Sequence, residues 1–164
     1  MTVVTSEQLE QIDERICNFT EAETEQTITR FTEQQPFLLA YFAVICEQDF
    51  GDYPEDADML SHGLLIIWIA LTEAAGVPFE QVQEKDILHR DEKLHSALET
   101  LALQSEETVK DAAARIVNAE HPQPHLLTYL LELAMTAEGI SDENRGLLFC
   151  YWWLILDCTL ARRA

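Results

Sequence analysis

Residues 35–41 read QPFLLAY, and residues 123–129 read QPHLLTY. The two stretches match at five of seven positions and lie 88 residues apart. Proline is tolerated in the first turn of a helix, where its missing N–H has no partner within the helix. Behind the proline, apolar residues recur at helical spacing in both copies. The repeated stretch therefore predicts the start of a buried helix, used twice.

The order of the segments extends this similarity beyond seven residues. Each copy is followed, after an acidic linker, by an apolar segment that begins Gly-Leu-Leu, at residues 63–65 and 146–148. Tryptophan occurs in both segments, at Trp68 and at Trp152 and Trp153. With only five glycines and five prolines, the chain lacks the turn residues that an all-β fold needs.

We therefore predict an all-α fold, a multi-helix bundle of seven or eight helices. Residues 1–164 are expected to form a single domain in which a three-helix unit is duplicated, with an approximate two-fold relation between the copies. The repeat units are predicted at residues 20–76 and 105–163, with residues 77–104 as a connector. The connector pattern predicts a short helix near Val82 and a second helix that begins at Asp91.

The acidic surface limits the classes of partner. The formal net charge is −20, and residues 1–84 hold 17 acidic residues against Arg15 and Arg30. Such a surface repels phosphate backbones and anionic lipids, so direct binding to nucleic acid and to membranes is not expected. A basic protein partner is compatible with this charge, and so is mimicry of a nucleic acid.

The four cysteines form no close pair with metal-ligand spacing. They are Cys17, Cys46, Cys150 and Cys158. Three of them lie in strongly apolar helical patterns, which is typical of free thiols in a reducing compartment. Residues 1–10 lack the features of a secretory signal, and the longest apolar stretch, residues 147–156, has ten residues where a membrane span needs about 20. We expect a soluble cytoplasmic protein.

Glu92 and His95 are the metal-ligand candidates in the sequence. Their Glu-x-x-His spacing puts both side chains on one side of a helix, as in di-iron bundles. A di-iron site needs a second such pair, and the sequence contains none. The charged neighbours favour a solvated turn, so no metal or other cofactor is expected. His62 precedes an apolar segment and is expected to be a packed, hydrogen-bonded histidine rather than a ligand.

Three further polar residues lie in apolar surroundings. Asp157 is embedded in the last helix and should reach solvent or pair with Arg162 or Arg163, because an unpaired buried charge is costly. Tyr41 and Tyr129 end the two copies of the repeated stretch. Their hydroxyls are expected to bond to polar groups near the interface of the units, with the lining of a ligand cleft as the alternative role.

Two places where the copies differ are candidates for partner contact. Trp152 and Trp153 point about 100° apart on a helix, so one of them can face outward and mark an interface. Asp52 and Asp56 lie in the first linker, which is five residues longer than the second. Acidic residues in the first turn of a helix also interact favourably with the helix dipole, which gives Asp56 a structural explanation as well.

These patterns do not define an activity. No nucleophile elbow or glycine-rich phosphate loop occurs in the sequence. We favour a non-enzymatic helical protein that binds a protein partner or associates with a second copy of itself. One alternative is a small-ligand or metal-dependent enzyme with a pocket between the two units. Another is an acidic mimic of a nucleic acid, which requires the carboxylates of residues 1–84 to form one extended stripe.

Overall fold

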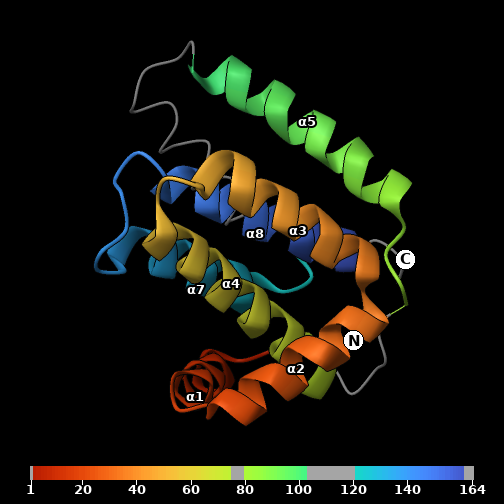
Figure 1. Ribbon diagram of the computed structural model, residues 1–164, viewed down its shortest axis with the longest axis vertical. Helices are drawn as coiled ribbons and strands as arrows, with labels where there is room; N and C mark the ends of the chain where they lie inside the picture. Colours follow the sequence, from red (N-terminus) through yellow and green to blue (C-terminus); the bar gives the residue numbers. More distant parts are fainter. Residues whose placement is uncertain (1, 75–79, 103–120, 161–164) are drawn as a thin grey trace.

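The computed structural model describes residues 2–74, 80–102 and 121–160, and these residues form an all-helical bundle (Figure 1). No strand occurs among them, which confirms the predicted all-α fold. Seven α-helices and one short π-helix are found in this part of the chain. They are α1 (Ser6–Cys17), α2 (Glu21–Gln34), α3 (Pro36–Phe50), α4 (Pro54–Ile69), η1 (Ala70–Ala74), α5 (Glu84–Ala102), α7 (Pro124–Thr136) and α8 (Arg145–Leu160).

Local sequence signals fix most of the helix starts. Proline occupies the first turn of α3, α4 and α7, where its missing N–H costs nothing. Thr20 and Glu23 form the capping box that the sequence indicates for α2. Helix α1 is capped by Thr5, with Gln8 completing a second capping box.

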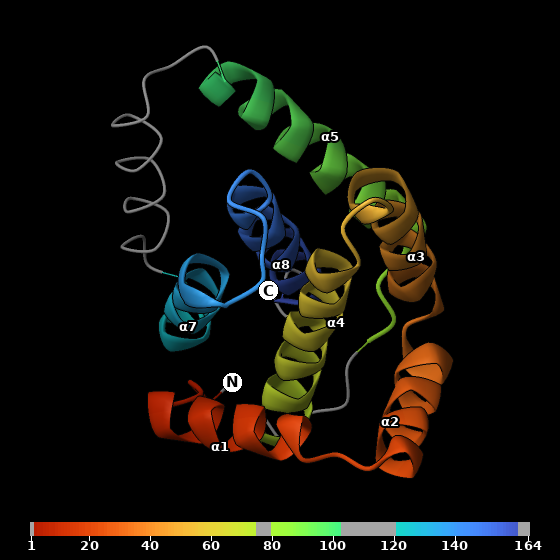
Figure 2. The ribbon, with the colours of Figure 1, turned by 60° about the vertical axis from the view of Figure 1, so that its left-hand side comes forward.

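Helix α8 lies at the centre of the bundle, between α4, α5 and α7 (Figure 2). It is apolar on all sides, and so is the second half of α4, which packs against it. A helix without a polar face has to be covered on every side, which explains the central position of this pair. Helices α1 and α3 pack on α4, and α1 also contacts α7.

Gly63 permits the close approach of α4 and α8. A Cβ atom built on Gly63 would lie 2.1 Å from the Trp152 indole, closer than any real contact. The Trp152 side chain is fully buried there and donates its Nε1–H to the Leu60 carbonyl at 3.0 Å. Gly146, which opens the second Gly-Leu-Leu segment, has open space at the corresponding position.

The glutamine that precedes each proline holds an extended segment of backbone from elsewhere in the chain. Gln35 is fully buried, and its Oε1 accepts the Val82 N–H at 2.9 Å. Its Nε2 donates to the Glu80 carbonyl at 3.0 Å. The side-chain amide thus pairs with both polar groups of a segment that leads directly into α5, which lies along α3 (Figure 2).

Gln123 makes the same two bonds at the other copy. Its Oε1 accepts the Val4 N–H at 2.9 Å, and its Nε2 donates to the Thr2 carbonyl at 2.9 Å. Gln123 is fully buried too. This segment leads into α1, so α1 is held against α7 in the way that α5 is held against α3.

The bonds at Gln35 involve Glu80 and Val82, which were predicted to belong to the connector. Val4 and Val82 lie 78 residues apart, and so do Asp13 and Asp91 on the helices that follow. The short helix predicted near Val82 is wrong, because Val82 lies in the non-helical segment before α5. The second predicted helix is part of α5, which begins at Glu84 rather than at Asp91. The internal duplication stays a prediction. Residues 75–79 and 103–120, which include the predicted unit boundaries at residues 76 and 105, lie outside the described residues.

Candidate functional site

An open groove lies between α3 and α5, with Tyr151 of α8 at its inner side. Its volume is about 370 Å³. The lining residues are Phe37, Ala40, Tyr41, Val44, Ile45, Gln48, Asp49, Glu84, Ile87, Leu88, Asp91, His95 and Tyr151. None of these residues is a lysine or arginine, while three of them carry carboxylates.

Apolar side chains at the groove are exposed to solvent. Phe37 is 38%, Val44 47% and Leu88 51% exposed. They stand on the two helices that form the groove, and they are three of the seven large apolar residues most exposed in the described structure. Apolar side chains gathered around one concavity, rather than scattered singly, are typical of a contact surface.

Two tyrosine–carboxylate pairs line the inner part of the groove. The Tyr41 hydroxyl donates to Asp91 Oδ1 at 2.5 Å, and the Tyr151 hydroxyl donates to Asp49 Oδ2. The two rings meet edge to face, with centroids 6.3 Å apart. Burial, and then the hydrogen bond to the carboxylate, raise the pKa of both tyrosines, so their hydroxyls remain protonated donors.

The junction of α1 and α7 contains a related tyrosine–carboxylate pair. Tyr129 of α7 donates to Oδ2 of Asp13 on α1, as Tyr41 of α3 donates to Asp91 on α5. The expectation that the two repeated tyrosines bond to polar groups is therefore confirmed. At both junctions the bond ties a Gln-Pro helix to the helix held by its glutamine.

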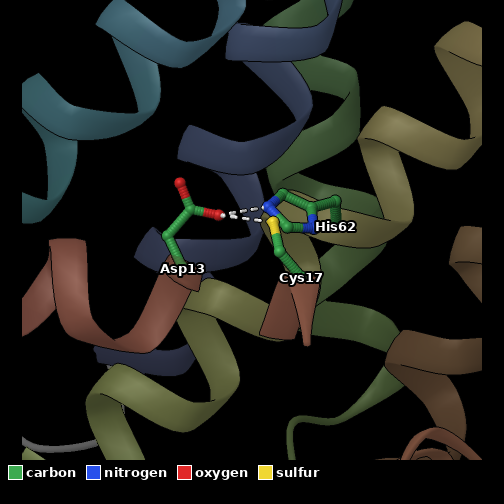
Figure 3. A group of neighbouring side chains, drawn as sticks. All are labelled: Asp13, Cys17 and His62. Carbon is green, nitrogen blue, oxygen red and sulfur yellow. Dashed lines mark hydrogen bonds and ion pairs between the residues drawn. The ribbon is translucent and has the colours of Figure 1, made fainter. Parts of the chain in front are cut away.

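At the α1–α7 junction, Asp13 is also one of three potential metal ligands (Figure 3). Its Oδ1 lies 2.5 Å from His62 Nε2, and the Cys17 sulfur lies 3.8 Å from the same oxygen. All three ligand atoms come within 4.8 Å of one another. Partial burial, and then the Asp13 charge, raise the pKa of the Cys17 thiol, so the free thiol keeps its proton at neutral pH.

Two of the four predicted partner contacts are wrong. Trp152 is fully buried against Gly63, so no partner reaches it. Asp56 is 1% exposed and accepts the Ser141 N–H at 3.0 Å and the Asn144 amide at 2.6 Å, which fixes the turn before α8. Asp52 is exposed and Trp153 is half-buried, so a partner contact at these two stays a prediction.

Among the described residues, neither Glu92 nor His95 belongs to a group of three potential metal ligands. Both lie on an exposed face of α5, and His95 Nδ1 contacts the Asp91 carbonyl at 3.0 Å.

Asp157 pairs with Arg90 at 3.1 Å and with His121 at 3.4 Å. The predicted partners Arg162 and Arg163 lie outside the described residues.

The Asp13, Cys17 and His62 cluster was missed by sequence reasoning. Asp13 precedes Cys17 by four residues and therefore shares a face of the helix with it. That spacing was the available signal. His62 was expected to have a hydrogen-bond partner, which is confirmed, but its sequence distance of 49 residues from Asp13 concealed the partner.

Comparisons with protein-family models, with curated proteins and with solved structures gave no match. Within the described residues, no helix is both long enough and apolar enough to cross a membrane.

Proposed function

We propose that the protein binds a basic amphipathic helix of a protein partner in the groove between α3 and α5. The observation that carries this proposal is the combination of exposed apolar side chains at the groove with carboxylates inside it. A helix laid into an apolar groove is a common mode of peptide recognition, with anchor residues three or four positions apart.

The negative charge of the groove and of the whole chain favours a basic partner. Asp49, Glu84 and Asp91 line the groove, and the whole chain carries a net charge of −20. A lysine- or arginine-rich segment is attracted to such a surface, and its association is accelerated at low ionic strength. A second copy of this chain, with the same net charge, is repelled. A basic partner is therefore favoured over self-association at this groove.

The inner wall suits a cationic side chain. Tyr41 and Tyr151 offer aromatic rings, and their hydroxyls already bind Asp91 and Asp49. A lysine or arginine over such a ring gains a cation–π attraction of about 0.5–2 kcal/mol. The carboxylates add charge attraction at the same place. We expect one basic side chain of the partner to enter here while the apolar face of its helix covers Val44 and Leu88.

The test uses two synthetic helical peptides with the same leucine face, one with lysine and arginine on the polar face and one with glutamate. Fluorescence anisotropy of a labelled peptide measures binding. We expect the basic peptide to bind and the acidic peptide not to bind. The double variant Val44→Gln, Leu88→Gln should weaken binding at least about tenfold, because uncharged polar side chains replace the apolar contacts without changing the charge of the groove.

Met135→Gln is the matched control. Met135 is similarly exposed on α7 but lies outside the groove, so its replacement should leave peptide affinity unchanged. Equal binding of the two peptides, or equal effects of the groove and control variants, would contradict the proposal.

A small organic cation is the second candidate for the same groove. The volume of about 370 Å³ lies within the range of small-molecule sites, and the tyrosine–carboxylate pairs suit an ammonium or guanidinium group. Calorimetric titration with agmatine and with choline separates the two candidates. Binding of such a cation, without binding of the basic peptide, would favour the small ligand.

A further inference from the structure

We propose that Asp13, Cys17 and His62 form a Zn²⁺ site with one coordination position open to solvent. This site lies at the α1–α4 contact, near α7, and does not depend on the groove between α3 and α5. Figure 3 shows the three side chains pointing toward one another, two from α1 and one from α4.

The donor set matches the preferences of zinc. One thiolate sulfur, one imidazole nitrogen and one carboxylate oxygen are ligand types that Zn²⁺ takes, whereas Mg²⁺ and Ca²⁺ require oxygen ligands. Three protein ligands with water in the fourth position are the arrangement of open zinc sites. Cys17 is exposed, so solvent reaches the remaining position.

The distances require only small movements. Ligand atoms of a tetrahedral zinc ion lie roughly 3.3–3.7 Å apart, given metal–ligand bonds of about 2.0–2.3 Å. The Cys17 sulfur is 3.8 Å from Asp13 Oδ1, close to this range. The Asp13 oxygen and His62 Nε2 are now hydrogen-bonded at 2.5 Å and would have to separate by about 1 Å to admit the ion.

A second residue orients the carboxylate. Tyr129 of α7 donates its hydroxyl hydrogen to Asp13 Oδ2, which leaves Oδ1 toward His62 and Cys17. Hydrogen bonds of this kind to the ligands are typical of zinc sites, where they fix the direction of the donor atom. The Asp13 carboxylate is thus held with one oxygen occupied and the other directed at the two remaining ligands.

The competing explanation is a hydrogen-bond network that ties α1 to α4 and α7 without a metal. Cobalt distinguishes the two, because a cobalt–thiolate bond absorbs light by charge transfer and a hydrogen-bond network does not. Chelator-treated protein without an affinity tag is titrated with Co²⁺ and then with Zn²⁺. We expect one Co²⁺ per chain, a thiolate charge-transfer band, and displacement by one equivalent of Zn²⁺.

Variants assign the ligands. Cys17→Ser should remove the charge-transfer band and lower Zn²⁺ affinity at least about 100-fold, measured by competition with a chromophoric chelator. His62→Gln should lower the affinity similarly but keep the band. Cys46→Ser, which changes a half-buried cysteine of α3, is the control and should change neither. Circular dichroism of each variant verifies that the helices are intact.

Absence of the band in the wild-type protein would overturn the proposal. So would a band that survives in Cys17→Ser or disappears in Cys46→Ser, or Zn²⁺ affinity that is equal in all four proteins.

Discussion

The α1–α7 junction and the α3–α5 junction are built from the same contacts and differ in the side chains that solvent reaches. In each, a buried glutamine holds the backbone before a helix, and a tyrosine six residues later donates to an aspartate on that helix. The shared contacts are those that dock one helix on another. These contacts give the repeated stretch in the sequence a structural role, because each copy docks one helix on another.

The exposed residues around these contacts differ in polarity between the two junctions. Phe37 and Val44 of α3 correspond, 88 residues later, to His125 and Glu132 of α7, which are exposed and polar. Leu88 of α5 stands 78 residues after Glu10 of α1. One junction thus presents apolar side chains in the positions where the other presents polar ones.

The residues four positions after the two aspartates differ as well. Asp91 has His95 four residues later, and Asp13 has Cys17 at the same spacing. Only Asp13, among the described residues, also meets a third potential ligand, His62 of α4. These differences are the basis for proposing a binding groove at the α3–α5 junction and a metal site at the α1–α7 junction.

Removing the glutamines should have the largest effect on stability. Gln35→Ala and Gln123→Ala each leave the N–H of a buried valine without its partner, remove a second bond to the carbonyl of an exposed residue, and open a cavity. We expect each variant to lose about 2–4 kcal/mol of unfolding free energy, measured by urea denaturation. Comparable losses would show that the two junctions are equally important for the fold.

Gln34→Ala, at an exposed position next to Gln35, is the control and should stay within about 0.5 kcal/mol of the wild type. A loss confined to Gln35→Ala would break the comparison, because α1 would then be held mainly by its contact with α4.

The sequence predicts the helices that follow the glutamines better than it predicts the roles of the glutamines themselves. Pro36 and Pro124 act within one helical turn, so their effect is visible in a short window. Each glutamine instead pairs with distant backbone: the N–H that Gln35 binds lies 47 residues away in the sequence, and the N–H that Gln123 binds lies 119 residues away. No local pattern specifies such a partner, which is why residues 77–104 were interpreted as a connector.

The same limit applies to the site residues. Asp56 follows a proline at a helix start, where the helix dipole is a sufficient local explanation, and yet it bonds to residues 85 and 88 positions later. The adjacency of Trp152 and Trp153 fixes the angle between them but not which one meets Gly63. Only the crossing of α4 over α8 decides that Trp152 is buried.

The two Gly-Leu-Leu glycines provide the second test of the comparison. Gly63→Ala places a Cβ against the Trp152 ring, which is packed and hydrogen-bonded and cannot move without displacing α8. We expect a loss of about 1–3 kcal/mol in unfolding free energy. Gly146→Ala meets open space within α8 and should be neutral or stabilise by up to about 1 kcal/mol.

Urea denaturation of both variants measures the difference directly. Equal effects at the two glycines would contradict the structure, since only Gly63 lies at the crossing of the central helices.

The tyrosines provide the smallest and most selective test. Tyr41→Phe and Tyr129→Phe each remove one hydroxyl–carboxylate bond and leave the ring in place. The carboxylates are partly exposed, with side-chain accessibilities of 26% for Asp91 and 22% for Asp13, so water replaces part of what is lost. We expect each variant to lose only about 1 kcal/mol of unfolding free energy.

The two tyrosine variants should lose similar stability, but they should differ in which affinity changes, that for Zn²⁺ or that for the basic peptide. Tyr129→Phe frees Asp13 Oδ2 and should lower Zn²⁺ affinity about tenfold, because the carboxylate is no longer oriented. Its affinity for the basic peptide should be unchanged. Tyr41→Phe frees Asp91 in the groove and should alter peptide affinity without altering Zn²⁺ affinity.

Chelator competition and anisotropy measure the two affinities on the same preparations. If either variant changed both affinities alike, the two junctions would be coupled through the central helices rather than specialised, because no single hydroxyl contacts both sites.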